Sequence, residues 1–169
     1  MSSKTAQRTS QKPANRTPIA GAAAPAFTLP RDGGGTVSLK DFAGRKLVLY
    51  FYPRADTPGC TTEAIDFSRL KAAFGRAGAD VLGVSADPVA AQDKFKAKHK
   101  LAIALASDER RKMLEAYGVW QEKSLYGRKF MGIARTTFLI GPDQRIAQVW
   151  PKVSVVGHAK EVFAAAKAL

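Results

Sequence analysis

The sequence predicts an α/β fold with a central mixed β-sheet and helices on both of its faces. Short apolar runs bounded by Gly and Pro, typical of buried strands, alternate with helix-length segments that carry apolar residues at spacings of three and four. Strands separated by helices pair in parallel, whereas two runs near the C-terminus are joined by a short turn and pair antiparallel. The 169 residues show no repeat and no shift in composition, which predicts one α/β domain.

The first part of this domain is predicted to contain a hairpin, a buried strand and a long helix. Residues 26–29 alternate as a short strand, and the Gly-rich turn at 32–35 leads to a second strand at 36–39. Residues 46–52 (KLVLYFY) form a nearly continuous apolar and aromatic run, as in a strand that is buried on both faces. A helix is predicted over 58–77, where apolar residues share one face.

The second part is predicted to continue this alternation and to close with a hairpin and a helix. Residues 80–85 (DVLGVS) form a second buried strand. A basic amphipathic helix is expected at 88–100, a short strand at 103–106 and a short helix at 109–117. An antiparallel hairpin of 135–140 with 145–150 and a closing helix at 156–169 complete the domain.

The N-terminal region differs from the rest in composition. Residues 1–25 are rich in Ser, Thr, Ala, Pro and Gln without apolar periodicity, which predicts disorder because too little surface can be buried. Within this region, residues 1–17 carry four basic side chains and no acid, so a disordered basic tail is assigned to 1–17 and the domain to 18–169. The apolar stretch is too short and too broken for a secretory signal, and the region is at most a weak transit signature.

The chain is strongly basic, with 27 Lys and Arg against 14 Asp and Glu, a net charge of +13. A basic surface attracts polyanions and binds nucleic acid weakly without sequence preference, although solubility alone also accounts for such charge. No zinc-finger spacing or RNA-recognition motif accompanies it. No run of about 18 apolar residues is present, so we expect no membrane span.

A single cysteine limits the available chemistry. It excludes an intrachain disulfide, a thiolate zinc cluster and a CxxC redox pair. His99 and His158 have no acidic or histidine partners at metal-ligand spacing, so neither a metal nor another cofactor is expected. The absence of disulfide pairs and of a secretory signal favours the cytoplasm as the location.

The cysteine lies where a strand passes into a helix. The buried strand ends at Tyr52, and Thr57 and Pro58 are suited to the N-cap and first positions of the helix. Cys60 then falls in the first turn, where free N–H groups and the helix dipole favour a thiolate. Gly59 lets a ligand approach the backbone. The alternative is an inert, buried cysteine that acts as a small apolar residue.

The motif Pro53-x-x-x-Thr57-x-x-Cys60 is the active-site pattern of peroxiredoxins, and TPGCTTEA around it resembles the peroxiredoxin Q branch, also called the bacterioferritin comigratory protein family. The resemblance extends from about Pro18 to the C-terminus. It rests on APAFTLPRDGG, DFAGRKLVLYFYP, DVLGVSAD, LASDE and YGVWQEKSLYGRKFMGIARTTFLIGPDQRI, which occur in the order of the family. It implies a thioredoxin-like fold.

The resemblance also implies a role for five residues. Cys60 is the peroxidatic cysteine, whose sulfur attacks the peroxide and becomes a sulfenic acid. Thr57 hydrogen-bonds the peroxide through its hydroxyl, and Pro53 shields the sulfur from water. Arg135 stabilises the thiolate and polarises the peroxide, and Glu63 holds that arginine.

Simple chemistry agrees with these roles. Cleavage of an O–O bond by a thiolate places negative charge on the leaving oxygen, which fixed hydrogen-bond donors stabilise. The guanidinium of Arg135 stays charged and offers several donors in one plane. Glu63 lies nearly one helical turn beyond Cys60 and therefore on the same face. The alternatives are an exposed strand arginine and a solvated helix glutamate.

The sequence departs from the family in lacking a second, resolving cysteine. The positions at which members carry it are occupied by Ile65 and, in the following helix, approximately by Lys96. The chain thus resembles a one-cysteine peroxiredoxin, and an external thiol such as thioredoxin, glutaredoxin or glutathione would reduce the sulfenic acid on Cys60. The expected assembly is a monomer or a weak homodimer.

The sequence therefore predicts a thiol-dependent peroxidase that reduces hydrogen peroxide and organic hydroperoxides in antioxidant defence. The alternative is a thioredoxin-like module that senses redox state or binds DNA or another polyanion. A two-thiol disulfide oxidoreductase is excluded, because the partner cysteine is missing.

Overall fold

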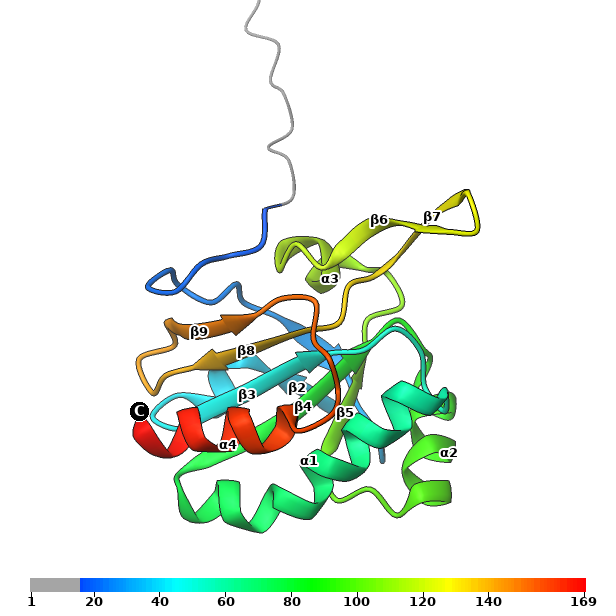
Figure 1. Ribbon diagram of the computed structural model, residues 1–169. Coiled ribbons are helices and arrows are strands. Elements are labelled where there is room, and N and C mark those ends of the chain that lie inside the picture. Colours follow the sequence, from blue (N-terminus) through cyan, green and yellow to red (C-terminus); the bar gives the residue numbers. More distant parts are fainter. Residues whose placement is uncertain (1–15) are drawn as a thin grey trace, which may run out of the picture.

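The fold is built around a five-stranded mixed sheet. A computed structural model describes residues 16–169 and orders the strands β5-β4-β3-β8-β9 (Figure 1). The strands are β3 (Lys46–Phe51), β4 (Ala79–Ser85), β5 (Ala104–Ser107), β8 (Thr136–Ile140) and β9 (Ile146–Trp150). Strands β3, β4 and β5 run parallel, whereas β8 is antiparallel to β3 and to β9. The predicted central mixed sheet is confirmed.

Three helices cover one face of this sheet. They are α1 (Pro58–Arg76), α2 (Val89–His99) and α4 (His158–Ala168). Tyr50 from β3 stacks on Phe67 from α1 with ring centroids 4.7 Å apart, and Phe67 meets the ring of His158 from α4 edge-on. These contacts fix the start of α4 and the middle of α1 against the central strand.

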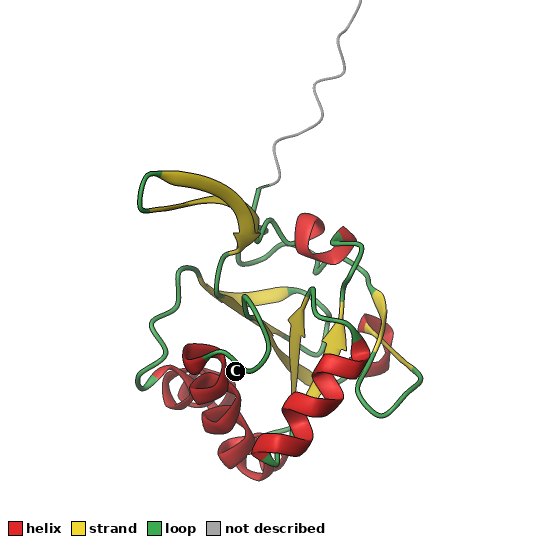
Figure 2. Ribbon diagram, turned by 90° about the vertical axis from the view of Figure 1, so that its right-hand side faces the viewer, coloured by secondary structure: helices red, strands yellow, loops and turns green. Residues whose placement is uncertain are grey.

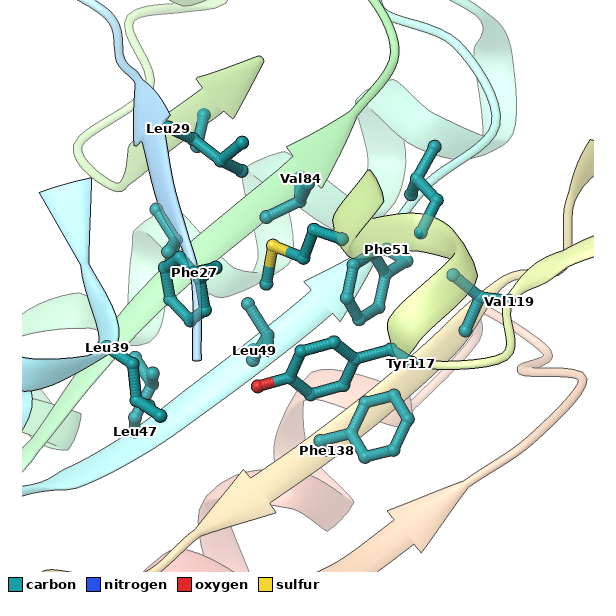
Figure 3. Packing of buried hydrophobic residues seen from close by; sticks show 14 of the residues in the cluster. Phe27, Leu29, Leu39, Leu47, Leu49, Phe51, Val84, Tyr117, Val119 and Phe138 are labelled. Carbon is teal, nitrogen blue, oxygen red and sulfur yellow. The ribbon is translucent and has the colours of Figure 1, made fainter. Parts of the chain in front are cut away.

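The other face is covered by smaller elements. They are the hairpin of β1 (Thr28–Pro30) and β2 (Thr36–Ser38), the 3-10 helix Leu39–Phe42 and the short helix α3 (Lys112–Ala116). Figure 3 shows Phe27, Leu29 and Tyr117 packed against side chains of β3, β4 and β8. Side chains of β3 alternate between the two faces, and those from Leu47 to Phe51 are completely buried. The strand predicted to be buried on both faces is therefore confirmed.

A hairpin that the sequence did not predict projects from the body of the domain. It consists of β6 (Trp120–Leu125) and β7 (Arg128–Ile133) and stands apart from the central sheet (Figures 1 and 2). Most of its side chains are exposed, so it lacks the apolar alternation that marks a strand lying on a core. Tyr126 and Gly127 form its turn with φ values of 50° and 75°.

Two other expectations need correction. Residues 1–15 lie outside the described part of the chain, but the disorder predicted for 18–25 is wrong. Backbone hydrogen bonds tie Gly21, Ala22 and Ala24 to residues 144–146, and the Tyr117 hydroxyl donates to the carbonyl of Pro25 at 2.7 Å. Thr17, which was assigned to the tail, donates to the carbonyl of Gly118 at 3.3 Å.

The helix predicted over 109–117 is shorter than expected. Arg111 has a φ of 62°, which a helix does not accommodate, and the carboxylate of Asp108 accepts the N–H of Leu114 at 2.8 Å. The helix therefore begins only at Lys112. None of the helices in residues 16–169 is long and apolar enough to cross a membrane.

Candidate active site

Cys60 is the third residue of α1 and lies at the end of β3. Thr57 is the N-cap in extended conformation and Pro58 is the first helical residue, as the sequence predicts. Cys60 is 1% exposed and belongs to the apolar cluster beneath α1. The first N–H groups of a helix have no acceptor within it, and together with the helix dipole they favour negative charge on this sulfur.

Arg135 donates a hydrogen bond to the sulfur of Cys60. It lies between β7 and β8, and β8 pairs with β3 so that Thr136 is opposite Phe51, the last residue of β3. Its Nη2 donates to the Cys60 Sγ at 3.3 Å. A Cβ at Gly59 would lie 3.3 Å from the same Nη2, so the guanidinium packs against the helix start where a side chain is missing. The sulfur therefore has a positively charged hydrogen-bond donor directly beside it.

Glu63 holds the other side of the guanidinium. Its Oε1 accepts a hydrogen bond from Arg135 Nη1 at 2.7 Å, while Oε2 has no partner among the described residues. The residue is 1% exposed, and burial raises the pKa of this carboxyl to about 7 although Arg135 opposes the shift. The buried Tyr50 hydroxyl also lacks a described partner, and burial raises the pKa of Tyr50 well above its usual value. Tyr50 was not among the predicted site residues.

Thr57 and Pro53 show no hydrogen bond to Cys60 among the described residues. The Thr57 hydroxyl donates to the carbonyl of Arg54 at 2.8 Å and makes no hydrogen bond to the helix N–H groups. Its oxygen can still accept a hydrogen bond, as the predicted role requires. Pro53 is exposed at the start of the loop, and its shielding of the sulfur stays a prediction.

Helix α2 is tied to the loop before α1. Asp56 has a φ of 61°, and its carboxylate binds Lys98 Nζ at 2.8 Å and His99 Nε2 at 2.7 Å. These two partners hold the pKa of Asp56 below its usual range. On the other side of the loop, the N–H of Ala55 donates to the carboxylate of Asp87 at 2.8 Å. The loop that carries Thr57 is therefore fixed from both sides.

Lys96 also forms an ion pair. Its Nζ lies 2.7 Å from Asp32 Oδ2, and Asp32 Oδ1 accepts the N–H of Leu105. Burial opposes ionisation of Asp32, but Lys96 and this N–H hold its pKa below the usual value. Two of the basic residues of α2, Lys96 and Lys98, thus bind carboxylates. No group of three or more potential metal ligands occurs in residues 16–169.

Comparison with known proteins identifies the family. Residues 20–149 match the AhpC/TSA family. The chain is 47% identical to peroxiredoxin Bcp of Xanthomonas campestris over 144 residues, covering 84% of this chain and 90% of that protein. It is 44% identical to peroxiredoxin Bcp of Bacillus subtilis over 143 residues, covering 85% and 91%.

Solved structures of similar proteins share the fold. Xanthomonas campestris peroxiredoxin Q superposes with a TM-score of 0.82 at 44% identity, covering 90% of this chain and 96% of that one. A cysteine-to-serine mutant of Xylella fastidiosa PrxQ gives 0.84 at 39% identity, with 90% and 97% covered. Two cysteines of the Xanthomonas protein, 36 residues apart, have each been replaced by serine in solved structures, and this is also the separation of Cys60 and Lys96. The chain belongs to the AhpC/TSA family, as a one-cysteine member of its Bcp or peroxiredoxin Q branch.

Proposed function

We propose that this thiol peroxidase reduces hydroperoxides by a one-cysteine mechanism centred on Cys60. The observation that carries the proposal is the hydrogen bond of 3.3 Å from Arg135 Nη2 to the Cys60 sulfur at the start of α1. A buried cysteine with only apolar neighbours is inert, whereas a charged donor beside the sulfur is typical of a nucleophilic cysteine. The alkyl peroxide reduction activity named for the Xanthomonas campestris bacterioferritin comigratory protein supports the same assignment.

In the first step the thiolate of Cys60 attacks the terminal oxygen of the hydroperoxide. An S–O bond forms and the O–O bond breaks, so the sulfur is oxidised to sulfenic acid and the peroxide leaves as an alkoxide. The proton that the thiol lost on ionisation is returned to this alkoxide through solvent, giving the alcohol or, from hydrogen peroxide, water. Arg135 contributes by donating to the sulfur and to the oxygen on which charge develops, and Thr57 by accepting the peroxide O–H.

In the second step an external thiol restores the enzyme. Its sulfur attacks the sulfenic sulfur of Cys60, water leaves, and a mixed disulfide forms. A second thiol then attacks this disulfide, releasing the oxidised reductant and the Cys60 thiolate. Lys96 supports this route, since an ion pair to Asp32 occupies the place at which a second thiol would be expected. Thioredoxin, glutaredoxin and glutathione are the reductants to compare.

The proposal is tested by oxidising the reduced protein with one equivalent of peroxide under rapid mixing. We expect loss of one thiol, a gain in mass of one oxygen that dimedone traps, and a rate far above that of free cysteine. Cys60→Ser is the matched control and should show none of these changes. Turnover should then require an added thiol. Reaction no faster than free cysteine would refute the peroxidase assignment, and turnover without any external thiol would refute the one-cysteine mechanism.

A further inference from the structure

Lys123 is an unusual residue on the projecting hairpin. It lies on β6 opposite Phe130 of β7, and the side chains that flank it in sequence, Glu122 and Ser124, are exposed. Lys123 itself is half-buried. A lysine on a projecting hairpin normally extends into water, so a specific path must take this side chain toward the protein.

That path crosses Gly132. A Cβ at Gly132 would lie 3.3 Å from Lys123 Cδ and 3.6 Å from Lys123 Cε, so the stem of the lysine rests on the bare backbone of β7. Gly132 is three residues before Arg135, and the N–H of Ala134 bonds to the carbonyl of Val119 at the base of the hairpin. The side chain therefore runs along the hairpin toward its base, where β7 leads into Arg135.

Two charged groups of the candidate site influence the ionisation of Lys123. Burial lowers the pKa of Lys123, Arg135 lowers it further, and the Cys60 sulfur raises it. In the described part of the chain Lys123 has no ion pair, and residues 1–15 contain neither Asp nor Glu. The one ion pair within the hairpin joins Lys129 to Glu122 at 3.7 Å.

An ammonium that is partly removed from water beside a guanidinium is unfavourable unless an anion compensates it. Arg135 already donates to Glu63 and to the Cys60 sulfur, whereas the Lys123 ammonium donates to no other residue in the range 16–169. We propose that Lys123 is a specificity-determining residue that binds a carboxylate carried by the molecule that reacts at Cys60. The proposal rests on the peroxidase function above. The carboxylate could belong to the hydroperoxide or to the reducing thiol.

The experiment compares matched reactants with and without a carboxylate in each half-reaction. For oxidation, a fatty-acid hydroperoxide is compared with its methyl ester, and for reduction, mercaptopropionate is compared with mercaptoethanol. Rates are measured by rapid mixing for the wild-type protein, for Lys123→Gln and for Lys129→Gln. Lys129 is the control because it is an exposed lysine on the neighbouring strand of the same hairpin.

We expect the carboxylate-to-neutral rate ratio to fall about tenfold to a hundredfold in Lys123→Gln, in at least one half-reaction, as for loss of one charged hydrogen bond. The ratio should stay at its wild-type value in Lys129→Gln, and added salt should lower it in the wild type. An equal loss for both members of each pair would overturn the proposal and indicate a general role in catalysis, as would unchanged ratios in both half-reactions. If the neutral hydroperoxide fails to oxidise Cys60 in the wild type, the peroxidase assignment itself fails.

Discussion

Replacing Glu63 by Gln should remove a pH-dependent loss of stability. Burial raises the pKa of this carboxyl from 4.5 to about 7 in the folded protein. Each pKa unit corresponds to about 1.4 kcal/mol, so ionised Glu63 costs the folded state about 3 kcal/mol. Because the folded state holds the proton more tightly than the unfolded state, this cost is absent below pH 4.5, grows as the pH rises, and is complete above pH 7. Gln keeps an oxygen for Arg135 and does not ionise.

The assay is urea unfolding of the wild-type protein and of Glu63→Gln from pH 4.5 to pH 8. Contributions from other groups are shared, so the difference in the free energy of unfolding isolates Glu63. We expect the two proteins to be similar at the acidic end and the variant to gain about 3 kcal/mol over the wild type at the alkaline end. A difference that is independent of pH, or that favours the wild type as the pH rises, would refute the reasoning. It would show that Arg135 outweighs burial and keeps Glu63 ionised.

Three further substitutions test the site and the core beneath it. Arg135→Lys keeps the charge but loses the planar pair of donors, and we expect the rate of Cys60 oxidation by peroxide in stopped-flow experiments to fall about a hundredfold. Gly83→Ala should lower the free energy of unfolding in urea by about 1–3 kcal/mol through overpacking, because its Cβ would lie 2.8 Å from the ring of Tyr50. Phe67→Ala should lower the same quantity by about 3–5 kcal/mol, because the ring is completely buried. A value under 1 kcal/mol for Phe67→Ala would contradict the packing described above.

The parts of the fold that bury side chains in a regular pattern could be predicted from the sequence. The apolar run at 46–52 predicts the bounds of β3 to within one residue, because both faces of this strand lie against a core. The segment 88–100 predicts α2. Pro88 is the N-cap of this helix, and Lys100, in the left-handed conformation, is its C-cap. Hairpin β6–β7 was missed because its strands pack on no core, and Tyr126-Gly127 was the one local sign of its turn. Patterns of burial therefore predict only the elements that packing stabilises.

The candidate site also has a part that the sequence predicts and a part that it does not. The sequence places Cys60 at a helix start and Glu63 one turn later, since both depend on local structure alone. Cys60 and Arg135 are 75 residues apart in the sequence, and their approach depends on the pairing of β3 with β8. Only the resemblance to a family predicts it. Nothing in the sequence indicates that Lys123 lies near the site, because its side chain crosses Gly132 only when β6 and β7 are paired.

The ion pair between Lys96 and Asp32 bears on how this chain could evolve. The carboxylate is 6% exposed and binds the lysine at 2.7 Å, so Lys96→Cys would leave it with weaker partners, the Leu105 N–H and Arg31 at 3.4 Å. An unsatisfied buried acceptor costs about 1–3 kcal/mol. A second cysteine at position 96 would thus require a compensating change at position 32 as well as the new thiol. The salt bridge between Lys96 and Asp32, which lies outside the candidate site, would therefore oppose the gain of a second cysteine in α2 and favour the proposed reduction by an external thiol.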